Sequence, residues 1–211
     1  MKKVLVLFAH PRIDRSETNS VLAKAAASVQ GVKVIDLYRE YPTFEIDVAV
    51  EQQRLLDHDI VVFQHPLYWY STPAILKEWQ DLVLEYKFAY GAEGDKLKGK
   101  VLFNAVTCGA RRETYSPTGA YTRELIELLA PFQETARLCQ MEYLPPFALF
   151  GSGHAIDEGE LEPHVKNYIT LLSALVEDQF DYAKARDALT LSEDLQSLLL
   201  SGTTPSSQAK G

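Results

Sequence analysis

Three consecutive aromatic residues, Tyr68, Trp69 and Tyr70, stand between a short apolar run and a predicted helix. The run at 59–63 is β-branched and aromatic without alternation, which is typical of a strand covered on both faces. The helix begins at Pro73, where the missing backbone N–H has no cost. Flat rings and free N–H groups at the carboxyl end of a parallel strand favour a flat ligand with polar edges, such as a flavin ring. The alternative is that Trp69 and Tyr70 only close the edge of the sheet.

A second group of polar residues opens the first predicted helix. Ser16, Thr18, Asn19 and Ser20 follow an apolar strand at 3–9. Free N–H groups, the positive end of the helix dipole and short hydrogen-bond donors would converge there, which favours an anion. The alternative is ordinary helix capping by Ser16 or Thr18. The sequence has neither a G-x-G-x-x-G motif nor a P-loop lysine, so it indicates neither a Rossmann dinucleotide loop nor a P-loop.

The elements that must position these residues alternate between strand and helix. We expect strands at 3–9, 33–37, 59–63 and 101–107, with a fifth strand in two pieces at 135–141 and 146–150. We expect helices at 16–31, 47–56, 73–86, 121–129 and 160–180. This alternation indicates an α/β fold with a doubly wound parallel sheet. Right-handed crossovers favour the flavodoxin-like order 2-1-3-4-5 with helices on both faces, so the loops after strands one, three and four meet at one mouth.

Length and composition set the domain count and exclude some functions. A chain of 211 residues with 46% hydrophobic residues is predicted to form one domain at 1–182, followed by a C-terminal extension at 183–211. Residues 189–200 have room for one or two amphipathic turns, and 201–211 are predicted to be disordered. The net charge of −8 and the pI near 5.2 argue against nucleic-acid binding.

The two cysteines and the apolar runs bear on metal content and location. Cys108 and Cys139 have neither metal-ligand spacing nor a disulfide framework, so we expect no metal site and reduced thiols. Cys108 is interpreted as a small filler, with a redox-sensing thiol as the alternative. No run approaches the length needed to span a bilayer. We therefore expect a cytoplasmic protein.

Three motifs in chain order resemble those of the NAD(P)H:quinone oxidoreductases. The first, at 10–19, is H-P-x-x-x-x-S-x-x-N. The second, at 66–79, is P-L-Y-W-Y-x-x-P-A-I-L-K-x-W, and F-A-Y at 88–90 continues it. The third, at 139–147, is C-x-M-x-Y-L-P-P-F, which is most similar to the ancillary flavoproteins of the Kef potassium-efflux systems. The resemblance covers roughly residues 3–180.

The resemblance implies roles for individual residues. The flavin phosphate end would be held by His10, Ser16, Asn19 and Ser20. The ring edge would be held by Pro66, Leu67, Tyr68, Trp69 and Tyr70. The family's Thr-Thr-Gly-Gly loop near the flavin N1 and O2 is matched by Thr107, Cys108, Gly109 and Ala110, where Cys108 replaces a threonine and Ala110 a glycine. Substituting alanine for glycine limits how closely the backbone approaches the ring.

The resemblance also implies catalytic and substrate residues. Gly109 and Tyr115 would stabilise the reduced flavin, with Tyr121 at the position of a histidine in the mammalian enzymes. The quinone pocket would be lined by Trp69, Tyr90 and His154. In the family, the residue matching Tyr90 reaches across a two-fold dimer, so we expect a homodimer.

The implied reaction is hydride transfer from NAD(P)H to flavin N5, followed by two-electron reduction of a quinone. The cofactor is FMN or FAD, and the spacing shared with the Kef proteins favours FMN. The alternative function is a regulatory subunit that activates a glutathione-gated potassium-efflux antiporter at the inner face of the membrane. A one-electron carrier flavodoxin is a third interpretation, which the aromatic loop disfavours. The sequence does not distinguish NADH from NADPH or identify the quinone.

Overall fold

The computed structural model describes residues 1–12, 14 and 16–200. Its centre is a parallel sheet in the order β2-β1-β3-β4-β5, with β6 also paired to β4. The strands are β1 (Val4–Phe8), β2 (Val32–Asp36), β3 (Ile60–Pro66), β4 (Val101–Thr107), β5 (Glu142–Tyr143) and β6 (Phe147–Leu149). The predicted flavodoxin-like sheet order is therefore confirmed.

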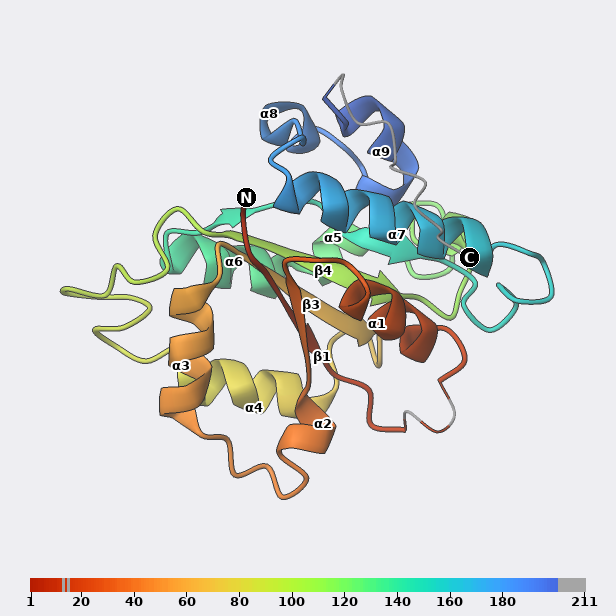
Figure 1. Ribbon diagram of the computed structural model, residues 1–211. Helices are drawn as coiled ribbons and strands as arrows, with labels where there is room; N and C mark the ends of the chain where they lie inside the picture. Colours follow the sequence, from red (N-terminus) through yellow and green to blue (C-terminus); the bar gives the residue numbers. More distant parts are fainter. Residues whose placement is uncertain (13, 15, 201–211) are drawn as a thin grey trace, which may run out of the picture.

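Helices cover both faces of the sheet (Figure 1). On one face lie α1 (Asn19–Ala27) and α7 (Leu161–Val176), and on the other lie α3 (Val48–Asp57), α4 (Ala74–Val83) and α6 (Ala130–Leu138). The shorter helices are α2 (Leu37–Glu40), α5 (Leu125–Leu128), α8 (Tyr182–Ala185), α9 (Leu191–Leu198) and the 3-10 turn η2 (Arg112–Thr114). None of the helices in the described part of the chain is long and apolar enough to cross a bilayer.

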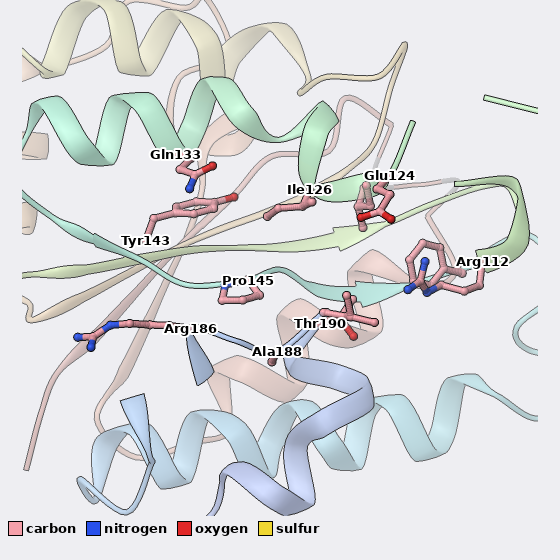
Figure 2. Close-up of a pocket in the computed structure, with 12 residues that line it drawn as sticks. Arg112, Glu124, Ile126, Gln133, Tyr143, Pro145, Arg186, Ala188 and Thr190 are labelled. Carbon is pink, nitrogen blue, oxygen red and sulfur yellow. The ribbon is translucent and has the colours of Figure 1, made fainter. Parts of the chain in front are cut away.

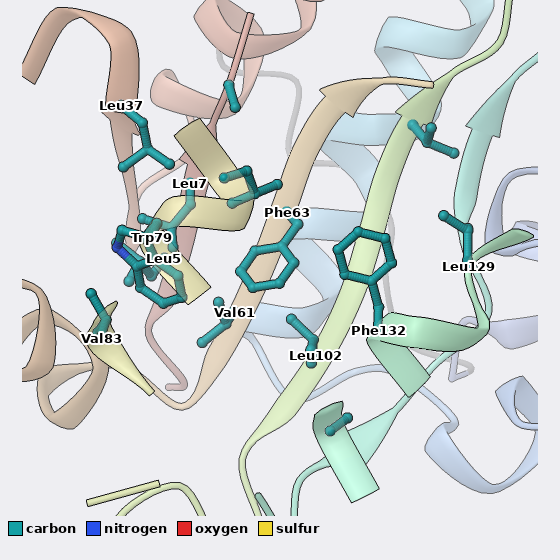
Figure 3. Packing of buried hydrophobic residues seen from close by; sticks show 14 of the residues in the cluster. Leu5, Leu7, Leu37, Val61, Phe63, Trp79, Val83, Leu102, Leu129 and Phe132 are labelled. Carbon is teal, nitrogen blue, oxygen red and sulfur yellow. The ribbon is translucent and has the colours of Figure 1, made fainter. Parts of the chain in front are cut away.

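Side chains of β3 alternate between two hydrophobic clusters, one on each face. Ile60 and Val62 belong to the cluster with α1 and α7, whereas Val61 and Phe63 belong to the cluster with α3, α4 and α6. The Phe63 ring lies 5.8 Å from Trp79 of α4 and 5.9 Å from Phe132 of α6, between centroids (Figure 3). A strand covered on both faces needs this continuous apolar run, as the sequence predicted.

The predicted strand at 135–141 is wrong, because α6 covers Ala130–Leu138. Pro131 lies in the first turn of α6 instead of ending a helix, and a proline has no cost there. Phe132 and Ala136, four residues apart, are both buried, so the apolar period is helical. The helix predicted at 121–129 is shorter, since α5 covers only Leu125–Leu128.

The edge of the sheet beyond β4 is made of two short strands, of which β6 lies within the predicted piece at 146–150 and β5 was not predicted. β5 pairs with the start of β4 and β6 with its end. Pro145 and Pro146 lie between them. A proline cannot donate to a sheet ladder, which explains the interruption.

Residues 183–200 continue the packed fold. α9 packs against α7 and β6, and its buried residues are Leu191, Leu195 and Leu198. The Leu191 N–H donates to the Pro146 carbonyl at 2.9 Å, and the Ser192 hydroxyl donates to the Ala148 carbonyl at 2.9 Å. This segment therefore covers the free edge of β6. The domain boundary at 182 stays a prediction, and the predicted disorder of 201–211 lies outside the described residues.

Candidate functional site

Loops after β1, β3, β4 and β6 meet at the carboxyl edge of the sheet around a cavity of about 340 Å³. Backbone bonds extend the sheet into these loops: Leu67 N–H donates to the Thr107 carbonyl and Cys108 N–H to the Leu149 carbonyl, both at 2.8 Å. The cavity is lined by His10, Ser16, Glu17, Thr18, Asn19, Pro66, Leu67, Tyr68, Thr107, Gly109, Ser152 and Gly153. Most of the predicted cofactor-binding residues therefore share one mouth, as the topology required.

The start of α1 brings two unpaired polar atoms to this cavity. The Asn19 amide donates to the Thr107 hydroxyl at 2.7 Å, which ties α1 to the end of β4. Among the described residues, Ser16 Oγ and Asn19 Oδ1 are buried without a hydrogen-bond partner. A buried polar group without a partner is unfavourable by about 1–3 kcal/mol. These atoms therefore mark a place where a polar ligand would complete the structure.

Ser20 does not reach this cavity, contrary to the prediction. Its hydroxyl donates to the Ser16 carbonyl one turn back. Its side chain instead lines a separate hollow beside β2. The helical period explains this, because Ser20 follows the cavity-lining Asn19 by one residue and its side chain is therefore rotated by about 100° around α1.

His10 stands at the mouth as a neutral imidazole. The Arg12 N–H donates to His10 Nδ1 at 3.2 Å, so the proton is assigned to Nε2. His10 Nε2 lies 3.3 Å from the Tyr68 hydroxyl. Burial lowers the pKa of His10. His10 therefore links the loops after β1 and β3, and the Tyr68 hydroxyl that accepts its proton keeps its own hydrogen to donate.

The aromatic residues at 68–70 form a tight antiparallel turn. Tyr68 N–H donates to the Ser71 carbonyl at 3.1 Å, and Ser71 N–H donates back at 3.0 Å. The central residues Trp69 and Tyr70 have φ of 49° and 63°, the geometry of a type I′ turn that Asn-Gly normally fills. Left-handed backbone costs about 1–2 kcal/mol per ordinary residue. The turn therefore holds Trp69, 92% exposed, at the rim, where it does not close the sheet edge.

Three tyrosines form a wall beside the aromatic turn. The Tyr70 ring lies 5.3 Å from Tyr121, which lies 5.1 Å from Tyr115, and Tyr115 lies 5.5 Å from Phe150, between centroids. Tyr115 is buried, and burial raises the pKa of its phenol. The predicted catalytic pair Tyr115 and Tyr121 is therefore in contact, and Tyr115 stays protonated at neutral pH.

Other predicted residues do not line the cavity. The Cys108 side chain is buried in the core, and burial raises the pKa of its thiol to about 12, which supports the filler interpretation. Ala110 is half-buried against the same core. Tyr90 packs on Tyr86, with centroids 5.9 Å apart, and His154 is exposed in the loop after β6. The roles of Tyr90 and His154 in a substrate pocket stay predictions.

Three lining residues were missed by sequence reasoning. Glu17 lies between the predicted Ser16 and Thr18 and could have been included by position alone. Ser152 and Gly153 follow β6, and the sequence analysis named only His154 from that loop. The signal that could have found Ser152 and Gly153 is their position directly after a predicted strand, because the carboxyl ends of all parallel strands meet at one edge of the sheet.

A second cavity, of about 160 Å³, lies away from this mouth (Figure 2). Its walls include Gln133 of α6, Tyr143 of β5, and Arg186 and Thr190 between α8 and α9. None of the predicted site residues lines it. The candidate functional site is therefore the mouth at the carboxyl edge.

A family model for the flavodoxin-like fold matches residues 2–172. The chain belongs to this flavodoxin-like family. Among its relatives is general stress protein 14 of Bacillus subtilis, 47% identical over 156 residues, which are 74% of this chain and 89% of the relative. An uncharacterised NAD(P)H oxidoreductase, YrkL, of Bacillus subtilis is 45% identical over 74% of this chain and 90% of its own length. KefG, an ancillary protein of the glutathione-regulated potassium-efflux system of Cronobacter sakazakii, is 45% identical over 70% of this chain and 80% of its own.

Two solved structures extend the flavodoxin-like comparison. General stress protein 14 of Treponema denticola, in complex with FMN, is 38% identical with a TM-score of 0.77, over 82% of this chain and 99% of that one. An NADPH-quinone reductase from P. pentosaceus is 29% identical with a TM-score of 0.71, over 82% and 97%. The resemblance to quinone reductases and Kef ancillary proteins is thereby confirmed.

The residues at the mouth fit an FMN. A phosphate needs donors at a helix N-terminus, and the unpaired Ser16 hydroxyl lies there. A ribityl chain carries hydroxyl donors, which suit the unpaired Asn19 Oδ1. The ring needs a flat wall, which Tyr68, the first residue of the turn, supplies, whereas Trp69 and Tyr70 do not line the cavity. His10, Ser16 and Asn19 would therefore hold the phosphate half, and the turn would hold the ring half.

Proposed function

We propose that this protein is an FMN-dependent NAD(P)H:quinone oxidoreductase. The observation that carries the proposal is the mouth itself, where the unpaired atoms Ser16 Oγ and Asn19 Oδ1 belong to residues that line one cavity, beside a strained aromatic turn. Strain of this kind persists at functional sites, where surrounding structure holds it in place. The FMN-bound relative and the relatives named as NAD(P)H oxidoreductase and NADPH-quinone reductase support the same reading.

The chemistry that a bound flavin would supply is to accept a hydride from a nicotinamide and then to reduce a quinone by two electrons. The residues of this chain would bind the flavin and orient it. The start of α1 and the Ser16 hydroxyl offer donors to the phosphate. The Tyr115 phenol stays protonated because it is buried, and it does not line the cavity. The hydrogen bond from Tyr115 to developing negative charge that the resemblance implies therefore stays a prediction. Trp69, which is 92% exposed, would pack beside the bound ring.

We also propose that the working form is a homodimer. Tyr68, Trp69 and Tyr70 are exposed together at the mouth, by 41%, 92% and 48%. Contiguous exposed aromatics mark interaction surfaces. A second copy would bring its Tyr90 to this rim and complete the quinone pocket with His154. Light scattering at micromolar concentration should give twice the chain mass, and a monomer with full activity would overturn this proposal.

The reaction is tested with purified protein, menadione, and NADPH or NADH. We expect flavin-dependent consumption of the nicotinamide with an equal amount of menadione reduced. A parallel assay with a one-electron acceptor separates the reductase from a carrier flavodoxin. Protein that binds FMN but reduces no quinone with either nicotinamide would contradict the proposed reaction.

A second candidate function is activation of a potassium-efflux antiporter. It is favoured by the 45% identity to KefG, and it would place the protein at the inner face of the membrane. Co-expression with a Kef-type antiporter in potassium-efflux assays tests it. Faster efflux in the presence of the protein would support this role, and unchanged efflux with full quinone reduction would leave the reductase alone.

A further inference from the structure

Two polar networks lie on opposite faces of β3, directly beneath the two halves of the mouth. Successive side chains of a strand point to opposite faces. Gln64 accordingly points toward α7 and His65 toward α6. Both side chains are completely buried, and neither lines the cavity. A buried amide and a buried imidazole in an apolar strand are unfavourable unless they are bonded, so their partners show what they hold.

Gln64 holds the start of α1. Its amide N–H donates to the Asn19 carbonyl at 3.0 Å. Its carbonyl oxygen accepts from the Tyr168 hydroxyl of α7 at 3.3 Å. Asn19 is the first residue of α1 and lines the cavity next to Ser16. Gln64 therefore fixes the segment that carries the unpaired donor and acceptor of the phosphate half.

His65 holds the base of the aromatic turn through a chain of directed bonds. His65 Nδ1 lies 3.0 Å from the Pro66 carbonyl, which can only accept, so Nδ1 carries the proton. His65 Nε2 then accepts from the Asn104 amide at 2.9 Å, and Asn104 Oδ1 accepts from the Tyr143 hydroxyl at 2.7 Å. Burial lowers the pKa of His65 to about 4, so the imidazole stays neutral at neutral pH, and the two hydrogen bonds fix its tautomer.

The Pro66 carbonyl is the point where this network acts. Pro66 ends β3, and the next N–H, of Leu67, donates to the Thr107 carbonyl at 2.8 Å. The His65 bond therefore sets the plane of the peptide from which the strained turn departs. Figure 2 shows Tyr143, the outer member of the network, under α6 beside the second cavity. It can be changed without touching the mouth.

We propose that Gln64 and the chain Tyr143–Asn104–His65 are positioning residues that hold the two halves of the mouth independently. Gln64 acts on the phosphate half through Asn19, and Asn104 acts on the ring half through His65 and Pro66. The names of the halves rest on the proposed function, whereas the mechanical coupling does not.

Two isosteric variants separate the networks. Gln64→Met and Asn104→Leu each remove buried polar atoms from adjacent strands, and each serves as the control for the other. Amide hydrogen exchange in flavin-free protein is read at 16–22 and at 67–71. We expect Gln64→Met to speed exchange about tenfold at 16–22 only, and Asn104→Leu at 67–71 only. The proposal would be overturned if each variant speeds exchange equally in both segments, or if the two variants speed exchange in neither segment.

Flavin binding supplies the second readout. Gln64→Met should raise the Kd for FMN about tenfold and raise that for riboflavin, which keeps the ribityl hydroxyls that suit Asn19 but has no phosphate, by a smaller factor. Asn104→Leu should raise both Kd values by the same factor and shift the flavin midpoint potential. If both variants raise the Kd for FMN and the Kd for riboflavin by the same factor, the two networks do not hold separate halves of the mouth. If the unsubstituted protein binds no flavin, the proposed function fails while the exchange result still decides the coupling.

Gentler variants cover the case in which a buried substitution prevents folding. Tyr143→Phe removes only the hydroxyl that Asn104 accepts, and Tyr168→Phe only the hydroxyl that Gln64 accepts. We expect the same two patterns with smaller changes, about threefold. Identical exchange patterns in these two variants would overturn the proposal.

Discussion

Single atoms, rather than surfaces, distinguish this mouth from the rest of the sheet edge. Ser16 Oγ and Asn19 Oδ1 are buried and unpaired among the described residues, although Asn19 Nδ2 is bonded to Thr107. Folding leaves such atoms unpaired only when another constraint outweighs the penalty. A ligand that completes both bonds is the simplest account.

Ser16→Ala tests this at the phosphate end. A hydrogen bond to a charged group is worth about 1.5–3 kcal/mol, so the Kd for FMN should rise tenfold or more, with little change for riboflavin. Isothermal titration measures both. Ser28→Ala is the matched control, because the Ser28 hydroxyl lies at the other end of α1 and donates to Ala25. Equal FMN affinity in Ser16→Ala and Ser28→Ala would show that Ser16 does not contact the ligand.

Two buried histidines predict how stability depends on pH. Burial lowers the pKa of His65 and of His164 to about 4. As pH falls below 6.5 the unfolded state binds protons that the folded state refuses until about pH 4, so stability is lost through this window. Between pH 7.5 and 5.5 each histidine should remove about 1.4 kcal/mol from the free energy of unfolding. Urea unfolding at the two pH values measures the loss.

His164→Phe should remove the share of one histidine, about 1.4 kcal/mol, from this pH-dependent loss. His164 stacks on Phe147, with centroids 4.4 Å apart, so an aromatic replacement keeps the contact. The change in the free energy of unfolding between pH 7.5 and pH 5.5 is compared for the variant and the parent. A change in stability that does not depend on pH cancels in this comparison. A variant with the same pH-dependent loss as the parent would show that His164 does not titrate in this window.

At the scale of elements, the sequence specified most of the positioning and misjudged one strand. Continuous apolar runs predicted β1, β3 and β4 because both faces of these strands are covered. Residues 135–141 mixed strand and helix signals, and only the burial of Phe132 and Ala136 resolves them as helix. The turn at 68–71 could not be predicted, because Trp69 and Tyr70 lack the propensity for its left-handed backbone.

Local residue preferences also limited how much of the site could be predicted. Residue types and strand ends predicted which loops meet, and hence His10, Ser16, Asn19, Thr107 and Gly109. Which way each side chain faces depends on helix phase and turn geometry. That is why Ser20 turned out to bond within α1 and Cys108 to lie in the core.

Trp69→Gly tests whether the turn stores strain for function. Glycine adopts positive φ freely, so the free energy of unfolding should stay the same or rise by up to about 1 kcal/mol, while quinone reduction falls at least tenfold. Trp79→Ala is the contrasting variant, because Trp79 is buried and donates to Glu51 at 2.9 Å. Trp79→Ala should lower the free energy of unfolding by about 3–5 kcal/mol. Thermal unfolding decides between the two, and a Trp69→Gly variant as unstable as Trp79→Ala would contradict the strained-turn account.

Across the whole molecule, the fold extends beyond the family match. The match ends at residue 172, whereas α8 and α9 follow and α9 seals the outer edge of β6. An exposed strand edge invites pairing with other chains. This segment therefore belongs to the stability of the molecule rather than to the mouth.

Leu195→Ala tests that structural role. Leu195 is buried in the cluster with α7, so its truncation should lower the free energy of unfolding by about 2–5 kcal/mol. Leu189→Ala, in the same segment but 65% exposed, should change it by less than about 0.5 kcal/mol. Chemical denaturation compares them. Equal stability of the two variants would mean that α9 is not part of the cooperative unit.

Whether the mouth binds a flavin is tested by identifying the flavin that the purified protein releases on denaturation, and by titrating the flavin-free chain with it. We expect FMN by mass, saturable binding of one FMN per chain, and restored NAD(P)H-dependent menadione reduction. A chain that releases no flavin and binds neither FMN nor riboflavin on titration would contradict the assignment of the mouth as a flavin site.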